Sequence, residues 1–256
     1  MSLLNPTLEE IERLWELIRA GFKALPKIEK IPIAFSSAEP VVNVVLPRFH
    51  PYSYDNKVTP KDSILYIGGA GEKNGKSVGI YSTMISIDDL SAAETVLAIF
   101  HQKLDVNFIS SQEADEVLPG DLCELSIIVG SPRSNPEAGR ILKKLDNSFD
   151  HQNFDLDADG ASSIKLLGMK ESVEKNQRIG YLVWALDPSD SKRAVICFAG
   201  NSATTTKRIA LYFRHNWASL RPDAENQGVA AILVADSETS RDITVKSKRF
   251  FGSFNT

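Results

Sequence analysis

The chain has 256 residues and a formal net charge of −4, with 43% hydrophobic and 24% charged residues. This is the composition of a globular protein that can bury a core without disulfides or a structural metal. The acidic balance argues against a nucleic-acid binder, and the sequence contains no apolar run of membrane-spanning length. Cys123 and Cys197 lie within apolar runs, which is typical of reduced thiols. We therefore expect a cytoplasmic protein with no membrane or nucleic-acid partner.

Residues 1–40 are predicted to form an N-terminal helix and a linker. Apolar residues follow helical spacing over residues 7–25, Thr7 is suited to cap the helix, and Pro26 ends it. Such an amphipathic helix packs on its own domain or on a partner, so a homodimer through this helix is one expectation.

Residues 41–120 are predicted to form the first half of an α/β unit. Short strands are expected at 41–46, 64–67, 78–87 and 106–109, with a helix beginning at Asp88. The glycine-rich segment 68–76 lies between two of these strands. A P-loop requires glycine where Ala70 stands and a helix where residues 78–82 are strand-like, so we expect a β-hairpin there.

Residues 121–256 are predicted to form a Rossmann-like α/β half, although 41–256 is also compatible with one continuous domain. Apolar strands are expected at 125–129, 164–169, 179–186, 194–199 and 229–235, with helices at 136–145 and from about 204 to 220. Alternating strands and helices are typical of parallel βαβ units. The predicted fold class is α/β: a Rossmann-like, mostly parallel sheet with helices on both faces, preceded by an N-terminal amphipathic helix and a β-hairpin.

The loop from Gly130 to Pro136 is the first candidate ligand site. It follows an apolar strand and opens a helix, an arrangement whose free N–H groups bind anions. Ser131, Arg133, Ser134 and Asn135 are the candidate ligand-binding residues, with Arg133 suited to a bidentate contact with phosphate or carboxylate. The alternative is that Ser, Asn and Pro simply cap the helix.

The loop after Gly200 has the same plan and is the second candidate. Asn201, Ser202, Thr204 and Thr205 offer amides and hydroxyls to phosphate or ribose oxygens. Lys207 and Arg208 then occupy the first turn of the helix, where a cation opposes the helix dipole. A bound anion would relieve that opposition; the alternative is that both side chains point into solvent.

No other pattern predicts a metal, a cofactor or a nucleophile. Residues 155–160 match the first half of an EF-hand loop, but Leu166 stands where the final glutamate is needed. The four histidines are widely separated. We therefore expect no metal and no cofactor, and the catalytic residues of any enzyme remain unknown, with Asp187 and Asp236 as possible carboxylates.

Two segments carry a resemblance to a known family. The first is the run 127–136, in which an apolar strand is followed by Gly-Ser-Pro and Asn-Pro. The second begins with Arg-Ile-Gly-Tyr-Leu at 178–182 and continues with residues 194–200 and 204–212. Together they resemble a Rossmann-like α/β domain of bacterial proteins that accompanies helix-turn-helix or conflict-system modules, over about residues 120–235. Ala203-Thr204 replaces the Gly-Thr of that pattern. The resemblance implies a sensor and names neither ligand nor reaction.

Three functional hypotheses follow. The first is a sensor module that binds a nucleotide-like or other anionic small molecule at the carboxyl edge of the sheet. The second is an enzyme that hydrolyses a nucleotide or glycosidic bond in the same pocket. The third is a scaffold that binds no ligand and dimerises through helix 7–25. The paired loops favour the first.

Overall fold

A computed structural model describes residues 41–47, 64–73, 76–100, 105–110, 124–149, 154–155, 162–187, 190–222, 228–237 and 242–252. The predicted N-terminal helix 7–25 and most of the acidic segment 155–160 lie outside these residues. Side chains are described for a smaller set, which excludes those of the hairpin strands β2 (Ile64–Lys73) and most of β3 (Lys76–Ser86).

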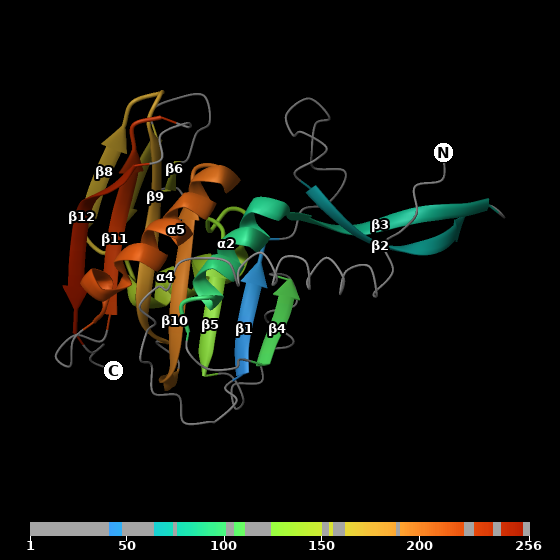
Figure 1. Cartoon of the computed structure of the whole chain (residues 1–256), viewed down its shortest axis with the longest axis horizontal. Coiled ribbons are helices and arrows are strands. Elements are labelled where there is room, and N and C mark those ends of the chain that lie inside the picture. Colours follow the sequence, from blue (N-terminus) through green and yellow to red (C-terminus); the bar gives the residue numbers. More distant parts are fainter. Residues whose placement is uncertain are drawn as a thin grey trace.

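Seven strands form the central sheet, in the order β12-β11-β9-β10-β5-β1-β4 (Figure 1). They are β1 (Val41–Leu46), β4 (Asp105–Ser110), β5 (Leu125–Val129), β9 (Arg178–Asp187), β10 (Asp190–Gly200), β11 (Gly228–Ala235) and β12 (Ile243–Phe251). Strands from both halves of the sequence therefore belong to one sheet. A smaller sheet contains β6 (Phe154–Asp155), β7 (Ser162–Leu166) and β8 (Met169–Val173).

The predicted mostly parallel, Rossmann-like sheet is wrong. Strands dominate the described residues, which contain three helices, and the central sheet is mixed. β4, β1, β5 and β10 pair in parallel, whereas β10, β9, β11 and β12 pair in antiparallel fashion with longer registers. Only two residues separate β9 from β10, and a connection that short permits a hairpin but not a parallel crossover.

Three helices begin where the sequence places good capping residues. The Ser86 hydroxyl accepts from the Asp89 N–H at the start of α2 (Ile87–Leu97). Asn135 caps α4 (Pro136–Leu145), and Ser202 caps α5 (Ala203–Leu220). Each cap satisfies an N–H group that the helix itself leaves without an acceptor.

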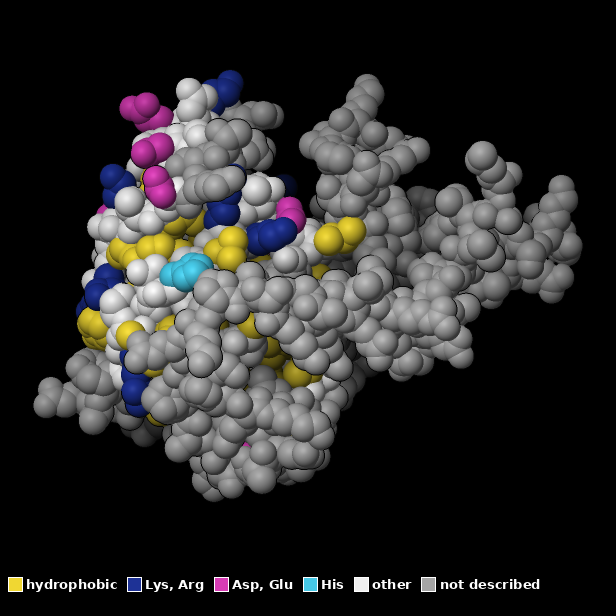
Figure 2. Space-filling view, viewed as in Figure 1, with side chains coloured by type: hydrophobic (Ala, Val, Ile, Leu, Met, Phe, Trp, Pro, Cys, Tyr) yellow, Lys and Arg dark blue, Asp and Glu magenta, His cyan; other side chains and the backbone are white. Residues whose placement is uncertain are grey.

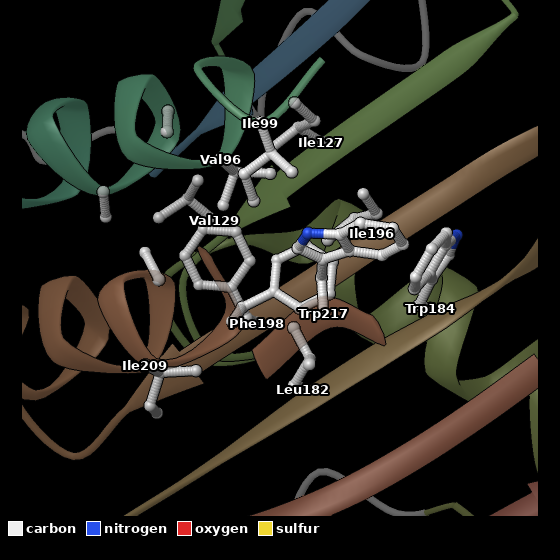
Figure 3. Packing of buried hydrophobic residues seen from close by; sticks show 14 of the residues in the cluster. Val96, Ile99, Ile127, Val129, Leu182, Trp184, Ile196, Phe198, Ile209 and Trp217 are labelled. Carbon is white, nitrogen blue, oxygen red and sulfur yellow. The ribbon is translucent and has the colours of Figure 1, made fainter. Parts of the chain in front are cut away.

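The helices divide between the two faces of the sheet. α2 and α5 pack together on one face, where their apolar residues join those of β1, β5, β9, β10 and β11 in one core. α4 and the strands β7 and β8 cover the other face and form a second core with the alternate residues of the same strands. Buried aromatic rings fill the first core: Trp217 of α5 lies near Phe198 of β10 (Figure 3).

Two elements were missed by the sequence reasoning. Residues 164–169, predicted as one strand, are the β7–β8 hairpin, whose turn residues Leu167 and Gly168 both have positive φ angles of 49° and 78°. β12 was not predicted, because Lys246, Lys248 and Arg249 leave residues 243–251 without the apolar run that marks the other strands. In the sheet β12 is an edge strand with a register shift opposite Ile232 and Leu233.

Candidate functional site

The two predicted loops leave the sheet side by side. They follow β5 and β10, which are neighbouring parallel strands, and the Gly130 N–H still donates to the Phe198 carbonyl at 3.0 Å. From there β5 leads into α4 on one face, while β10 leads into α5 on the other. The sequence prediction that these loops share one edge of the sheet agrees with this placement.

The loop 130–135 is held by hydrogen bonds to its own backbone and to β9. Gly130 has φ 109°, a conformation that side chains other than glycine rarely adopt. The Tyr181 hydroxyl on β9 donates to the Gly130 carbonyl at 3.1 Å. The Ser131 and Ser134 hydroxyls lie 3.2 Å apart and are partly buried, and Ser134 also donates to the Ser131 carbonyl.

Asn135 is fully buried and has a structural role. Its amide nitrogen donates to the carbonyls of Val45 at 3.2 Å and Val129 at 2.7 Å, and its oxygen accepts from the Glu137 N–H. Asn135 thereby joins β1, β5 and the start of α4. Its predicted role in ligand binding is not supported, because all of these contacts would have to break to expose it.

Arg133 differs from its neighbours in this loop. Its side chain is exposed, and it makes no hydrogen bond or ion pair with the residues that the structure describes. A guanidinium presents five N–H donors, and those of Arg133 remain available to solvent or to an anion.

The hydroxyls of the second loop bond mainly to one another. The Ser202 oxygen accepts from the Thr205 N–H at 3.2 Å and lies 2.9 Å from the Thr205 hydroxyl, which also donates to the Asn201 side chain. Thr205 is buried, whereas Asn201, Ser202 and Thr204 are partly exposed. The structure therefore brings the four predicted residues together, but as a helix cap whose hydroxyls are largely satisfied.

A carboxylate of the chain itself lies at the start of α5. Asp88, in the first turn of α2, accepts from the Thr204 hydroxyl and from the Lys207 ammonium, each at 3.3 Å. The positive charge of Lys207 at this helix end is therefore paired with the carboxylate of Asp88. The sequence reasoning did not associate Asp88 with this loop. Arg208, the other cation, donates to the Ser237 carbonyl at 3.3 Å.

Asp89 lies beside Asp88 and is buried. Loss of solvation, reinforced by the charge of Asp88, raises the pKa of the Asp89 carboxyl to about 7. This carboxyl therefore gains and loses its proton around neutral pH in the folded protein, and not near pH 4 as an ordinary aspartate does.

The two carboxylates considered for catalysis lie in different places. Asp187 is buried, 3.6 Å from Arg193, at the end of β9 that pairs with the start of β10. That end is opposite to Gly200, roughly 23 Å away at strand spacing, so Asp187 does not belong to the same edge. Asp236 follows β11 at the correct edge and is exposed.

Two groups lie beneath the loops: Glu137, which the sequence reasoning did not single out, and Cys197, which lies in the apolar run noted from sequence. Glu137, buried in the first turn of α4, accepts from the Arg140 guanidinium in a bidentate pair. The Cys197 thiol lies 3.3 Å from the Tyr181 hydroxyl in the core. Burial is the main cause that raises the pKa of Cys197 to about 12, which leaves it a structural thiol rather than a nucleophile.

Comparison of the chain with protein-family models, with curated proteins and with solved structures gives no match. The resemblance over residues 120–235 therefore stays a sequence-based prediction. Among the described helices, none has the length and apolar character needed to cross a membrane.

Proposed function

We propose that this protein is a binding module for a small anionic molecule, with its site at the carboxyl edge of β5 and β10. One observation carries the proposal: these neighbouring parallel strands send their following helices to opposite faces of the sheet. In open α/β sheets, ligands bind outside the carboxyl ends of strands at the point where the connections diverge in this way. The connections after β5 and β10 diverge in this way, although the sheet as a whole is mixed.

Arg133 is the residue expected to recognise the anion. It is the exposed guanidinium of a loop whose backbone is fixed by Asn135 and by Tyr181. The start of α4 lies three residues further on and adds the positive end of a helix dipole. Ser131, Ser134 and Thr204 keep partial exposure and are the additional candidates for contact.

The proposal is tested by thermal unfolding of the whole chain with nucleotides, dinucleotides and sugar phosphates. A ligand at about 100 times its Kd stabilises the fold by about 2.7 kcal/mol, which raises the melting temperature by roughly 5–10 °C. Arg133→Ala is expected to abolish the shift. The control is Arg221→Ala, which removes another exposed arginine just beyond the C-terminal end of α5.

A shift that survives in Arg133→Ala would reject Arg133 as the anion contact. A flat response to every probe would reject the binding module. A ligand that binds also allows turnover to be measured directly, and any product that accumulates with time would favour the enzyme over the sensor.

A further inference from the structure

A second feature of the same sheet edge lies on the outer side of α5. An open groove of about 520 Å³ runs between α5 and the start of β12, within the size range of small-molecule sites. Arg208, Tyr212 and His215 lie on one stripe of the helix, and Ile243 forms part of the opposite wall. In Figure 2 a histidine lies among hydrophobic side chains on this face.

The middle of the groove is apolar. Leu211 is 38% exposed, a large value for a leucine on a helix that packs on a sheet. Tyr212 is half-buried and packs against the core on one side, and this loss of solvation raises the pKa of its hydroxyl. Together with Ile243 these side chains offer a surface on which a flat ring can lie.

The ends of the groove carry charge of both signs. Arg208 is held by one hydrogen bond from its Nη1 to the Ser237 carbonyl, and a guanidinium has further N–H donors beyond that one. His215 is exposed two turns further along α5. Asp242 contributes a carboxylate to the other wall, and the Asn216 amide nitrogen donates to the Tyr212 carbonyl at 2.9 Å. A guanidinium suits an anionic group, and a carboxylate suits an amino group.

We propose that this groove binds a nucleoside monophosphate whose base carries an exocyclic amine. The base lies on Leu211, Tyr212 and Ile243, and the Arg208 guanidinium binds the phosphate. Asp242 accepts a hydrogen bond from the amine. This site is separate from the loop that contains Arg133 and does not depend on the function proposed for that loop.

Isothermal titration of the whole chain separates the two halves of this recognition. The probes are AMP, GMP and CMP, with UMP as the base that lacks an amine, adenosine as the ring without phosphate, and ribose 5-phosphate as the phosphate without a ring. At least one amine-bearing nucleotide is expected to bind at least tenfold more tightly than UMP, adenosine or ribose 5-phosphate. Equal binding of ribose 5-phosphate would reduce the site to an anion contact, and equal binding of adenosine to an apolar patch; either result overturns the proposal.

Two variants locate the binding. Arg208→Gln and Leu211→Glu are each expected to weaken the nucleotide at least tenfold, and since Leu211 is exposed its replacement leaves the core intact. Arg221→Gln is the matched control, at the residue that follows α5 and outside the groove. Binding that is lost in Arg133→Ala but retained in Arg208→Gln and Leu211→Glu would overturn the groove while supporting the loop. Absence of binding by all three amine-bearing nucleotides at about 1 mM would also overturn the groove. A Kd above about 1 mM corresponds to less than about 4 kcal/mol of binding free energy.

Discussion

Asn135→Ala is the substitution that best tests the structural role of the loop before α4. The change removes the helix cap and two side-chain hydrogen bonds to strand carbonyls, all within a fully buried site. A cap contributes about 1 kcal/mol, and each hydrogen bond contributes about 1 kcal/mol net. The free energy of unfolding is therefore expected to fall by about 3 kcal/mol.

Urea unfolding followed by circular dichroism measures this loss, which corresponds to a midpoint lower by roughly 1 M at an m-value of about 3 kcal/mol/M. Asn135→Ser keeps an acceptor for the cap but not the amide donors, so we expect it to lose about 2 kcal/mol of the same free energy. Asn147→Ala, at an exposed position beyond the other end of α4, is the control.

A loss below about 0.5 kcal/mol in Asn135→Ala would refute the reasoning, because it is the effect expected of an ordinary surface substitution. It would show that the Asn135 contacts contribute little and would return this residue to the set available for a ligand. Equal losses in the Ser and Ala variants would place the whole effect in the amide donors rather than in the cap.

Three further outcomes are expected. The folded-state pKa of Asp89 is raised to about 7 from 3.8, so its contribution to stability is greatest below about pH 4 and is lost as pH rises toward 7. The free energy of unfolding therefore falls with pH in this window, by at most about 1.4 kcal/mol per pH unit. Asp89→Asn should remove this pH dependence in urea titrations at several pH values. Cys197, buried and with a raised pKa, should react with iodoacetamide only on unfolding, and labelling of the native protein detected by peptide mass spectrometry would contradict this. Lys246→Val with Lys248→Val should increase aggregation measured by light scattering, because lysines on an edge strand prevent pairing with other chains; unchanged scattering would show that the register shift alone suffices.

Local signals allowed much of the fold to be predicted. The apolar run 125–129 and the Asn135-Pro136 cap gave β5 and α4 with the bounds that the structure shows. The Gly-rich segment was correctly assigned to a hairpin, although β2 and β3 continue through most of it. In each case the physical cause lies within a few residues of sequence, namely burial of a strand, capping of a helix or a tight turn.

The direction of the strands depends on more distant information and was misjudged. β9 and β10 are apolar on both faces, as strands of a parallel sheet are, because α5 covers one face and the residues of α4, β7 and β8 cover the other. An antiparallel pair buried on both sides has the same sequence pattern. β12 escaped prediction because Ser247 and the basic residues Lys246, Lys248 and Arg249 leave it without a continuous apolar run.

The candidate site shows the same division between local and distant causes. Hydroxyls and amides at the start of a helix are suited equally to capping and to anion binding, so their residue types cannot separate the two roles. What separates them is the supply of partners: Asn135 bonds to strands 90 and 6 residues away, and Thr204 bonds to Asp88, 116 residues away. The polar residues that reach such partners stabilise the fold, whereas Arg133 and the groove residue Arg208 keep donors that the described residues do not use fully. A search for ligands should therefore begin with these two guanidinium groups, each at the carboxyl edge of the sheet, and not with the hydroxyl-rich turn that looked most like a phosphate site.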